Sequence, residues 1–125
     1  MPILVMKFGG TSVANLERIE NAAKKVTTGQ YSVALGSNAA KNTTTLNSTV
    51  AIGSYAARSY SNSTGNSVYI GFESGYNGGG SNNTAVGANT LHSSSHTNKN
   101  TAIGDYAGNA IGGEENTVIG RRAGM

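Results

Sequence analysis

The chain contains no cysteine, no tryptophan and a single proline, and only 12% of its residues are charged. Without cysteine it can form neither disulfides nor thiolate metal sites, and its redox compartment is left undetermined. With two phenylalanines and no tryptophan, it has few of the large side chains that fill an ordinary globular core. No stretch of roughly 18 consecutive apolar residues occurs, so we predict no membrane span.

The charge of the chain is small and unevenly placed. The formal net charge is +3, and the C-terminal three quarters of the chain carry no stripe of lysine or arginine. Because phosphate contacts require clustered basic side chains, we expect no nucleic-acid partner. The first residues lack a basic segment and a small-residue cleavage site, so we predict no secretory signal.

Serine, threonine, asparagine and glycine dominate most of the chain, a composition that is also typical of disorder. A phrase repeated about every 17 residues argues against disorder, because a disordered tract has no reason to keep apolar residues in phase. The phrases are SVALG, TVAIG, SVYIG, NTAVG, NTAIG and NTVIG, which end at Gly36, Gly53, Gly71, Gly87, Gly104 and Gly120. The repeat predicts one supersecondary unit that is stacked six times.

Each phrase predicts a very short β-strand that ends in a glycine bend, since glycine adopts positive φ without strain. The residue before each glycine is a branched aliphatic, and we expect these residues to form the core of the repeats: Leu35, Ile52, Ile70, Val86, Ile103 and Ile119. Side chains alternate across a strand, so the residue before them faces the other way. The alanines at that position are the candidates for contacts between subunits: Ala34, Ala51, Ala85 and Ala102.

One period therefore predicts one coil, made of a strand, a glycine bend, an extended piece and a polar return loop. Six coils at about 4.8 Å per strand would form a rod about 29 Å long. The fold class is accordingly all-β, a parallel β-solenoid over residues 29–125. Because each coil buries little and gains stability only from its neighbours, we expect the chain to oligomerise.

Residues 1–28 follow a different pattern, which predicts a strand, a glycine turn and a helix. The stretch KFGGTSVAN, from Lys7 to Asn15, resembles the opening of aspartate kinases, of the amino-acid kinase family. In that family the matching lysine and glycines contact ATP phosphates, which implies a phosphate site at Lys7, Gly9, Gly10 and Ser12. The resemblance covers about a fifth of the chain, and nothing after Lys25 continues it. We therefore favour a cap or oligomerisation neck, whether native, recruited or fused, over a nucleotide-binding remnant.

The repeats of residues 30–125 resemble two related groups, the heads of trimeric autotransporter adhesins and the repeat regions of bacteriophage tail fibres. The resemblance is carried by NTAVG at Asn83–Gly87, NTAIG at Asn100–Gly104 and STVAIG at Ser48–Gly53. It implies a left-handed β-roll wound into a homotrimer, in a virion or at a cell surface. The longer period and the lack of a signal or stalk favour the tail-fibre group.

Few side chains are arranged for chemistry. His92 and His96 lie four residues apart, but in a Ser/Thr/Asn-rich stretch that presets no ligand geometry, so we expect no metal site. The acidic residues of the repeats fall in different coils without partnered bases: Glu73, Asp105, Glu114 and Glu115. We therefore expect no catalytic residues, no cofactor and no enzymatic activity.

Tyrosines beside the repeats are the candidate ligand surface, because recognition of glycans and protein surfaces often uses tyrosine faces flanked by Asn and Ser. The candidates are Tyr55, Tyr76 and Tyr106, and the alternative is that they only cover thin coils. The leading hypothesis for function is a trimeric rod that displays polar loops to a host-surface glycan or protein. A self-assembling extracellular filament, a threonine-lined ice or mineral surface and a kinase remnant are the alternatives.

Overall fold

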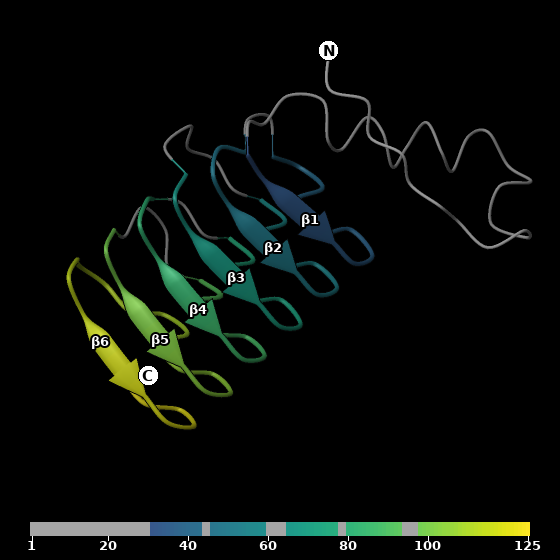
Figure 1. Ribbon diagram of the computed structural model, residues 1–125. Coiled ribbons are helices and arrows are strands. Elements are labelled where there is room, and N and C mark those ends of the chain that lie inside the picture. The colour runs from purple at the N-terminus through teal and green to yellow at the C-terminus, as the bar shows by residue number, and fades with distance from the viewer. Residues whose placement is uncertain (1–30, 44–45, 60–64, 78–79, 94–97) are drawn as a thin grey trace, which may run out of the picture.

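The computed structural model describes residues 31–43, 46–59, 65–77, 80–93 and 98–125. Six three-residue strands form one parallel sheet in sequence order (Figure 1). They are β1 (Val33–Leu35), β2 (Val50–Ile52), β3 (Val68–Ile70), β4 (Thr84–Val86), β5 (Thr101–Ile103) and β6 (Thr117–Ile119). The fold is a parallel β-solenoid with one strand in each period, as the repeat predicted. The described residues contain no helix, and the expected segment 1–28 lies outside them.

The strands pair in step, so that equivalent residues of successive repeats lie side by side. Ala34 pairs with Ala51, and Ala85 pairs with Ala102. Because the strands are parallel, each must be followed by a crossover that returns the chain to the same end of the sheet. The turn after each glycine and the polar loop before the next strand form this crossover (Figure 1).

The turns are stacked as regularly as the strands. Tyr55 N donates to the carbonyl of Ser37 in the preceding coil at 2.9 Å, and Ala57 N donates to Ser74 in the following coil at 2.9 Å. Residues two and four positions after each repeat glycine have positive φ, for example 59° at Tyr55 and 49° at Ala57. The extended piece expected after the glycine is therefore a tight turn, because two left-handed residues reverse the chain within one coil.

The interior of the solenoid is narrow, and most of its buried hydrophobic residues are alanines; Leu46, Tyr69 and Leu91 are the larger side chains in it. Ala51, Ala85 and Ala102 are 0% exposed and face the turn layer, whose Ala56 and Ala107 are also 0% exposed. Where alanines of the strands face alanines of the turns, little more than methyl groups separates the two layers. Close packing of this kind makes small changes of volume costly.

This geometry reverses two expectations about the strands. The alanines expected at a subunit interface, Ala34, Ala51, Ala85 and Ala102, point into the chain, where three are fully buried and Ala34 in the first coil is partly buried. The aliphatic residues expected in the core lie on the outer side: Leu35, Ile52, Ile70, Val86, Ile103 and Ile119. Strand alternation places their side chains on the side of the sheet that faces away from the turn layer.

A ladder of buried polar side chains runs along the entrance to the strands, at the first position of each repeated phrase. Asn100 is 1% exposed, its Oδ1 accepts from Asn116 N at 2.9 Å, and its own N donates to Asn83 Oδ1 at 2.9 Å. In earlier coils serine hydroxyls accept in the same way, as Ser67 does from Asn83 N at 3.1 Å. The side-chain oxygens of the ladder accept hydrogen bonds from backbone N–H groups that lie just outside the three-residue strands.

The ladder gives a first testable prediction. Replacing Asn100 by valine removes the acceptor for Asn116 N and the donor to the Gly113 carbonyl, which lies 3.2 Å away. We expect a loss of about 2 kcal/mol in the free energy of unfolding, measured by urea denaturation. Asn100→Ser keeps an acceptor, as in the earlier coils, and should cost clearly less. Equal losses in the two variants would contradict a role for this hydrogen bond.

Candidate functional site

Three planar side chains stack at one corner of the solenoid, each five residues after a repeat glycine. They are Arg58, Tyr76 and His92 from successive coils. The Tyr76 and His92 rings are parallel within 8°, with their centroids 4.9 Å apart. The Arg58 Cζ lies 5.1 Å from the centre of the Tyr76 ring. These separations are close to the rise of about 4.8 Å between parallel strands, so the fold itself sets the stacking distance.

Two further aromatic rings extend this stack. Tyr55 lies 6.2 Å from Tyr76 between ring centroids, and the Arg58 Cζ is 5.4 Å from the Tyr55 ring. Phe72 meets Tyr55 edge-to-face at 6.4 Å and 83°, and it is 49% exposed. With Glu73, whose Oε2 lies 3.3 Å from His92 Nε2, these residues form what we call the aromatic–cation cluster: Tyr55, Arg58, Phe72, Glu73, Tyr76 and His92.

Arg58 is the charge at the centre of this cluster. Its Nη1 donates to the Tyr76 hydroxyl, and its guanidinium faces both tyrosine rings, an arrangement with favourable cation–π attraction. Within the described part of the chain, no carboxylate lies within ion-pair distance of Arg58. Its buried Nε has no hydrogen-bond partner there either. Among the described residues Arg58 therefore has no ion-pair partner, and the carboxylate of the cluster, Glu73, lies against His92 instead.

The acidic residues of the repeats do have partners, contrary to expectation. Glu73 lies near His92, Asp105 Oδ2 lies 3.4 Å from Arg121 Nε, and Glu115 Oε1 lies 2.8 Å from Lys99 Nζ. Glu114 accepts from Asn98 Nδ2. In every case the partner belongs to the adjacent coil. Residues about one period apart occupy equivalent positions on adjacent coils, so charges that are distant in the sequence become neighbours in space.

The Lys99–Glu115 pair perturbs the titration of both groups. The hydrogen bond from Lys99 and its positive charge lower the pKa of Glu115 below the usual 4.5, and the same contacts with Glu115 raise the pKa of Lys99 above 10.5. The lowered carboxyl pKa contributes stability above pH 4.5, which is lost as the pH falls through the native value. The raised ammonium pKa contributes below pH 10.5, and that is lost as the pH rises through the native value.

The second prediction concerns this pair. In Lys99→Met we expect the pKa of Glu115 to return toward 4.5, because the hydrogen bond and the neighbouring charge are both removed. An NMR titration of the Glu115 side chain measures this directly. Raising the salt concentration of the unmodified protein should shift the pKa of Glu115 part of the way in the same direction, because the pair is exposed and dissolved ions screen its charges. An unchanged pKa in the variant would contradict the contact.

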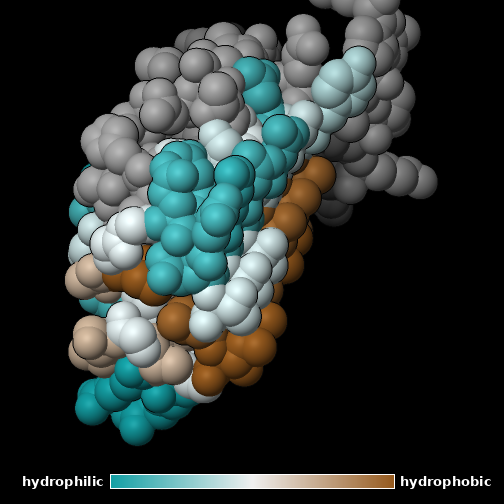
Figure 2. Space-filling model, turned by 90° about the vertical axis from the view of Figure 1, so that its left-hand side faces the viewer, coloured by the Kyte–Doolittle hydropathy of each residue, from teal (hydrophilic) through white to brown (hydrophobic). Residues whose placement is uncertain are grey.

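A second surface lies on the outer side of the sheet. We call it the aliphatic face, and it consists of the first and third residues of the strands: Val33, Leu35, Val50, Ile52, Val68, Ile70, Thr84, Val86, Thr101, Ile103, Thr117 and Ile119. It contains no charged residue. The exposed fractions reach 63% at Leu35, 39% at Ile103 and 67% at Ile119. Figure 2 shows hydrophobic residues in a band along one side of the rod.

No family model, no curated protein and no solved structure matches the chain. The candidate surfaces are therefore interpreted from their own geometry and chemistry.

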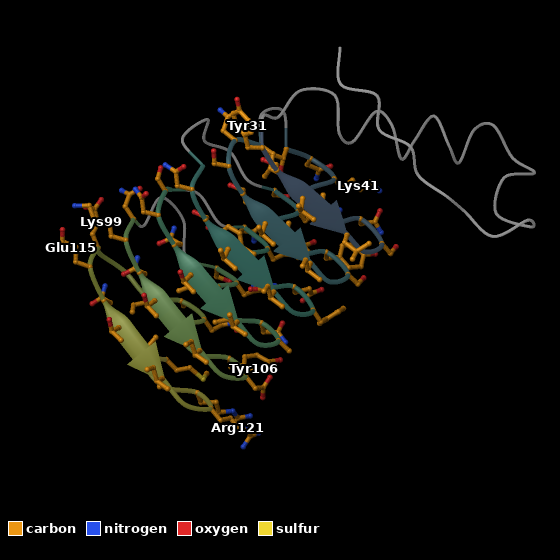
Figure 3. The ribbon with its side chains drawn as sticks, in the orientation of Figure 1. Tyr31, Lys41, Lys99, Tyr106, Glu115 and Arg121 are labelled. Carbon is orange, nitrogen blue, oxygen red and sulfur yellow. The ribbon has the colours of Figure 1, made fainter. Side chains whose placement is uncertain are left out.

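The expected ligand tyrosines are only partly brought together. Tyr55 and Tyr76 lie in the same cluster, whereas no ring contact joins Tyr106 to another described residue. Figure 3 shows Tyr106 and Arg121 at the turns that follow the strands, away from Lys99 and Glu115 at the loops before them. Tyr106 is 37% exposed and lies in the turn after β5, near the C-terminal end of the rod.

Several other expectations fall outside the described residues. The implied phosphate site at Lys7, Gly9, Gly10 and Ser12 lies there, and so does His96. Among the residues that the structure places, no group of three or more His, Asp or Glu side chains could hold a metal ion. In the same part of the chain there is no helix of the length and hydrophobicity needed to cross a membrane.

Sequence reasoning missed four members of the cluster: Arg58, Phe72, Glu73 and His92. The available signal was their register. Arg58, Tyr76 and His92 are each five residues after a repeat glycine, so a count from the glycine would have placed them in one column. The histidine was instead considered with His96, its neighbour in sequence, although residues one period apart are the neighbours in a solenoid.

Proposed function

We propose that this chain is a structural rod that assembles with parallel copies of itself, as a homotrimer, and uses its turns and loops to attach to a surface. The aliphatic face is the observation that carries the proposal. It is continuous over six strands, free of charge and uncovered by any described residue of the chain. An exposed apolar patch of this kind often marks an interaction surface.

The size of the face suits association. The exposed fractions of its aliphatic residues correspond to roughly 500 Å² of apolar surface. Burying that area would contribute about 12 kcal/mol per chain at the usual 25 cal/mol/Å². This is comparable with the cost of about 4–15 kcal/mol for lost rigid-body freedom on association, so the whole length of the face must be covered. Copies in parallel and in register achieve this, because each strand then meets its own equivalents.

The arrangement also accounts for the small core. The chain buries mainly alanine methyl groups between its two layers, and its large aliphatic residues are left outside. In an assembly the aliphatic residues would form a shared core along the rod axis, while the turns and polar loops remain outside. The resemblance of the repeats to tail fibres and adhesin heads supports the same organisation, a trimeric attachment module in a virion or at a cell surface.

The test is the mass of the protein in solution, compared between two matched lysine variants. Light scattering of the unmodified chain should give about three times the chain mass of 12.7 kDa. Ile103→Lys places a charge on the aliphatic face and should weaken assembly about 100-fold or more. Tyr106→Lys is the control, because Tyr106 has nearly the same exposure, 37% against 39%, but lies on a turn.

Three outcomes of this experiment would contradict the proposal. The first is a stable monomer of the unmodified chain at about 0.1 mM. The second is equal weakening by the two lysine variants. The third is a spread of masses reaching many multiples of the chain, which would instead favour an end-to-end filament.

A further inference from the structure

We propose that the aromatic–cation cluster is a binding site for carboxylated saccharides, in which Arg58 holds the carboxylate and the rings of Tyr55 and Phe72 support the sugar. This inference rests on the proposed function, because it names the ligand class of the attachment surface. It draws on the cluster alone, and so it can be tested whether or not the chain assembles.

Arg58 supplies the positive charge and the N–H donors for an anion. A guanidinium carries five N–H donors, and this one uses Nη1 for the Tyr76 hydroxyl and has an unpartnered Nε. Among the described residues of the turns, Arg121 is paired with Asp105, whereas Arg58, like Lys41 and Arg122, has no carboxylate within ion-pair distance. A partly buried arginine in this state favours a planar oxyanion, which accepts two parallel N–H bonds.

The support for a sugar ring comes from the aromatic residues. Phe72 is 49% exposed and stands edge-to-face on Tyr55, and Arg58 lies against the Tyr55 ring. The pair is held by stacked coils, so it offers a rigid apolar surface directly beside the charge. A pyranose presents C–H groups on one face and hydroxyls on its rim, and the C–H groups pack well on the electron-rich face of an aromatic ring.

Neutral polar side chains line the cluster, and they favour a saccharide over a peptide or an apolar partner. Ser59, Asn77 and Ser93 each lie six residues after a repeat glycine, in a column next to Arg58, Tyr76 and His92. Asn77 and Ser93 are exposed, and Ser59 is partly exposed. Their hydroxyl and amide groups donate and accept hydrogen bonds without charge, which suits a rim of hydroxyls.

The test uses the whole chain and two probes that differ only in charge. We expect the tetramer of galacturonic acid to shift the NMR signals of the Tyr55, Phe72 and Tyr76 rings, and its methyl-esterified form to bind at least about ten-fold more weakly. Arg58→Gln and Phe72→Ser should each weaken binding of the acidic tetramer about ten-fold. Arg121→Gln, which removes a paired and exposed arginine, should leave it unchanged.

Several results would overturn the site. They are no binding of the acidic tetramer at about 10 mM, equal binding of the esterified form, equal binding of a tetraglutamate peptide, or equal weakening by Arg121→Gln. Signal shifts in the unmodified protein decide the matter if Arg58→Gln fails to fold. Light scattering of the same samples separates the two proposals. A monomer that binds the tetramer keeps this site and rejects the assembly, whereas a trimer that does not bind rejects the site alone.

Discussion

Gly71→Ala is expected to lose about 3–5 kcal/mol of unfolding free energy, enough to prevent folding of a marginally stable chain. A methyl group at Gly71 would lie 2.6 Å from the carbonyl carbon of Gly87 in the next coil. The carbonyl carbon and oxygen of Gly87 are backbone atoms, so neither coil can move away without breaking the hydrogen bonds between β3 and β4. The φ of +132° adds strain for any residue with a side chain.

The same repeat position provides the control. At Gly120 the φ is similar, +121°, but no atom lies within 4 Å of the added methyl group. Gly120→Ala should therefore show only the backbone strain, about 1–2 kcal/mol. Urea denaturation followed by circular dichroism gives both values. If the two variants lost the same free energy, the close approach of the coils would not be the reason for the repeat glycine.

The second large effect is expected in β3, where Tyr69 occupies the middle strand position that is alanine in β1, β2, β4 and β5. This residue is 1% exposed, and a methyl group at Gly75 would lie 2.9 Å from its Cγ and closer still to its Cδ1 and Cε1. Gly75→Ala should therefore cost about 3 kcal/mol, because a fully enclosed ring cannot move aside. Tyr69→Ala should cost about 3–5 kcal/mol, because it leaves a cavity.

A double-mutant cycle separates this clash from any intrinsic strain at Gly75. In the Tyr69→Ala background, Gly75→Ala should cost less than about 1 kcal/mol, which gives a coupling energy of 2 kcal/mol or more. The coil that precedes it already carries alanine at both positions, Ala51 and Ala57, and Ala57 has a φ of 49°. Additive losses in the cycle would show that Gly75 is needed for its backbone conformation and not for the room that it leaves to Tyr69.

The rod carries two surfaces with different chemistry, and we propose a different role for each. The aliphatic face is uncharged and regular over six coils, which suits contact with an identical surface in register. The aromatic–cation cluster occurs once in the described part of the chain, over three coils, and combines a cation, partly exposed rings and neighbouring neutral polar groups. A regular surface serves assembly, whereas a local and irregular one serves recognition, and a solenoid can carry both because each coil position is varied independently.

The sequence by itself determined the period, the strands and the glycine turns. These features are local or repeated, so the residues that specify them recur in every unit, as Gly36 and Gly104 do. Parallel in-register stacking followed from the same repetition, because it alone places equivalent residues together. The polar residue before each strand was also visible, although its buried ladder through Asn100 was not.

Only the tertiary structure decided which side of each strand faces inward. Alternation shows that a strand has two different faces, but the space behind it depends on where the chain returns. Here the turn layer returns on the side of Ala102, and Ile103 lies on the side that faces away from it. The contacts within the aromatic–cation cluster likewise required the tertiary structure. The register places Arg58, Tyr76 and His92 in one column, but the turn conformation decides that their side chains stack.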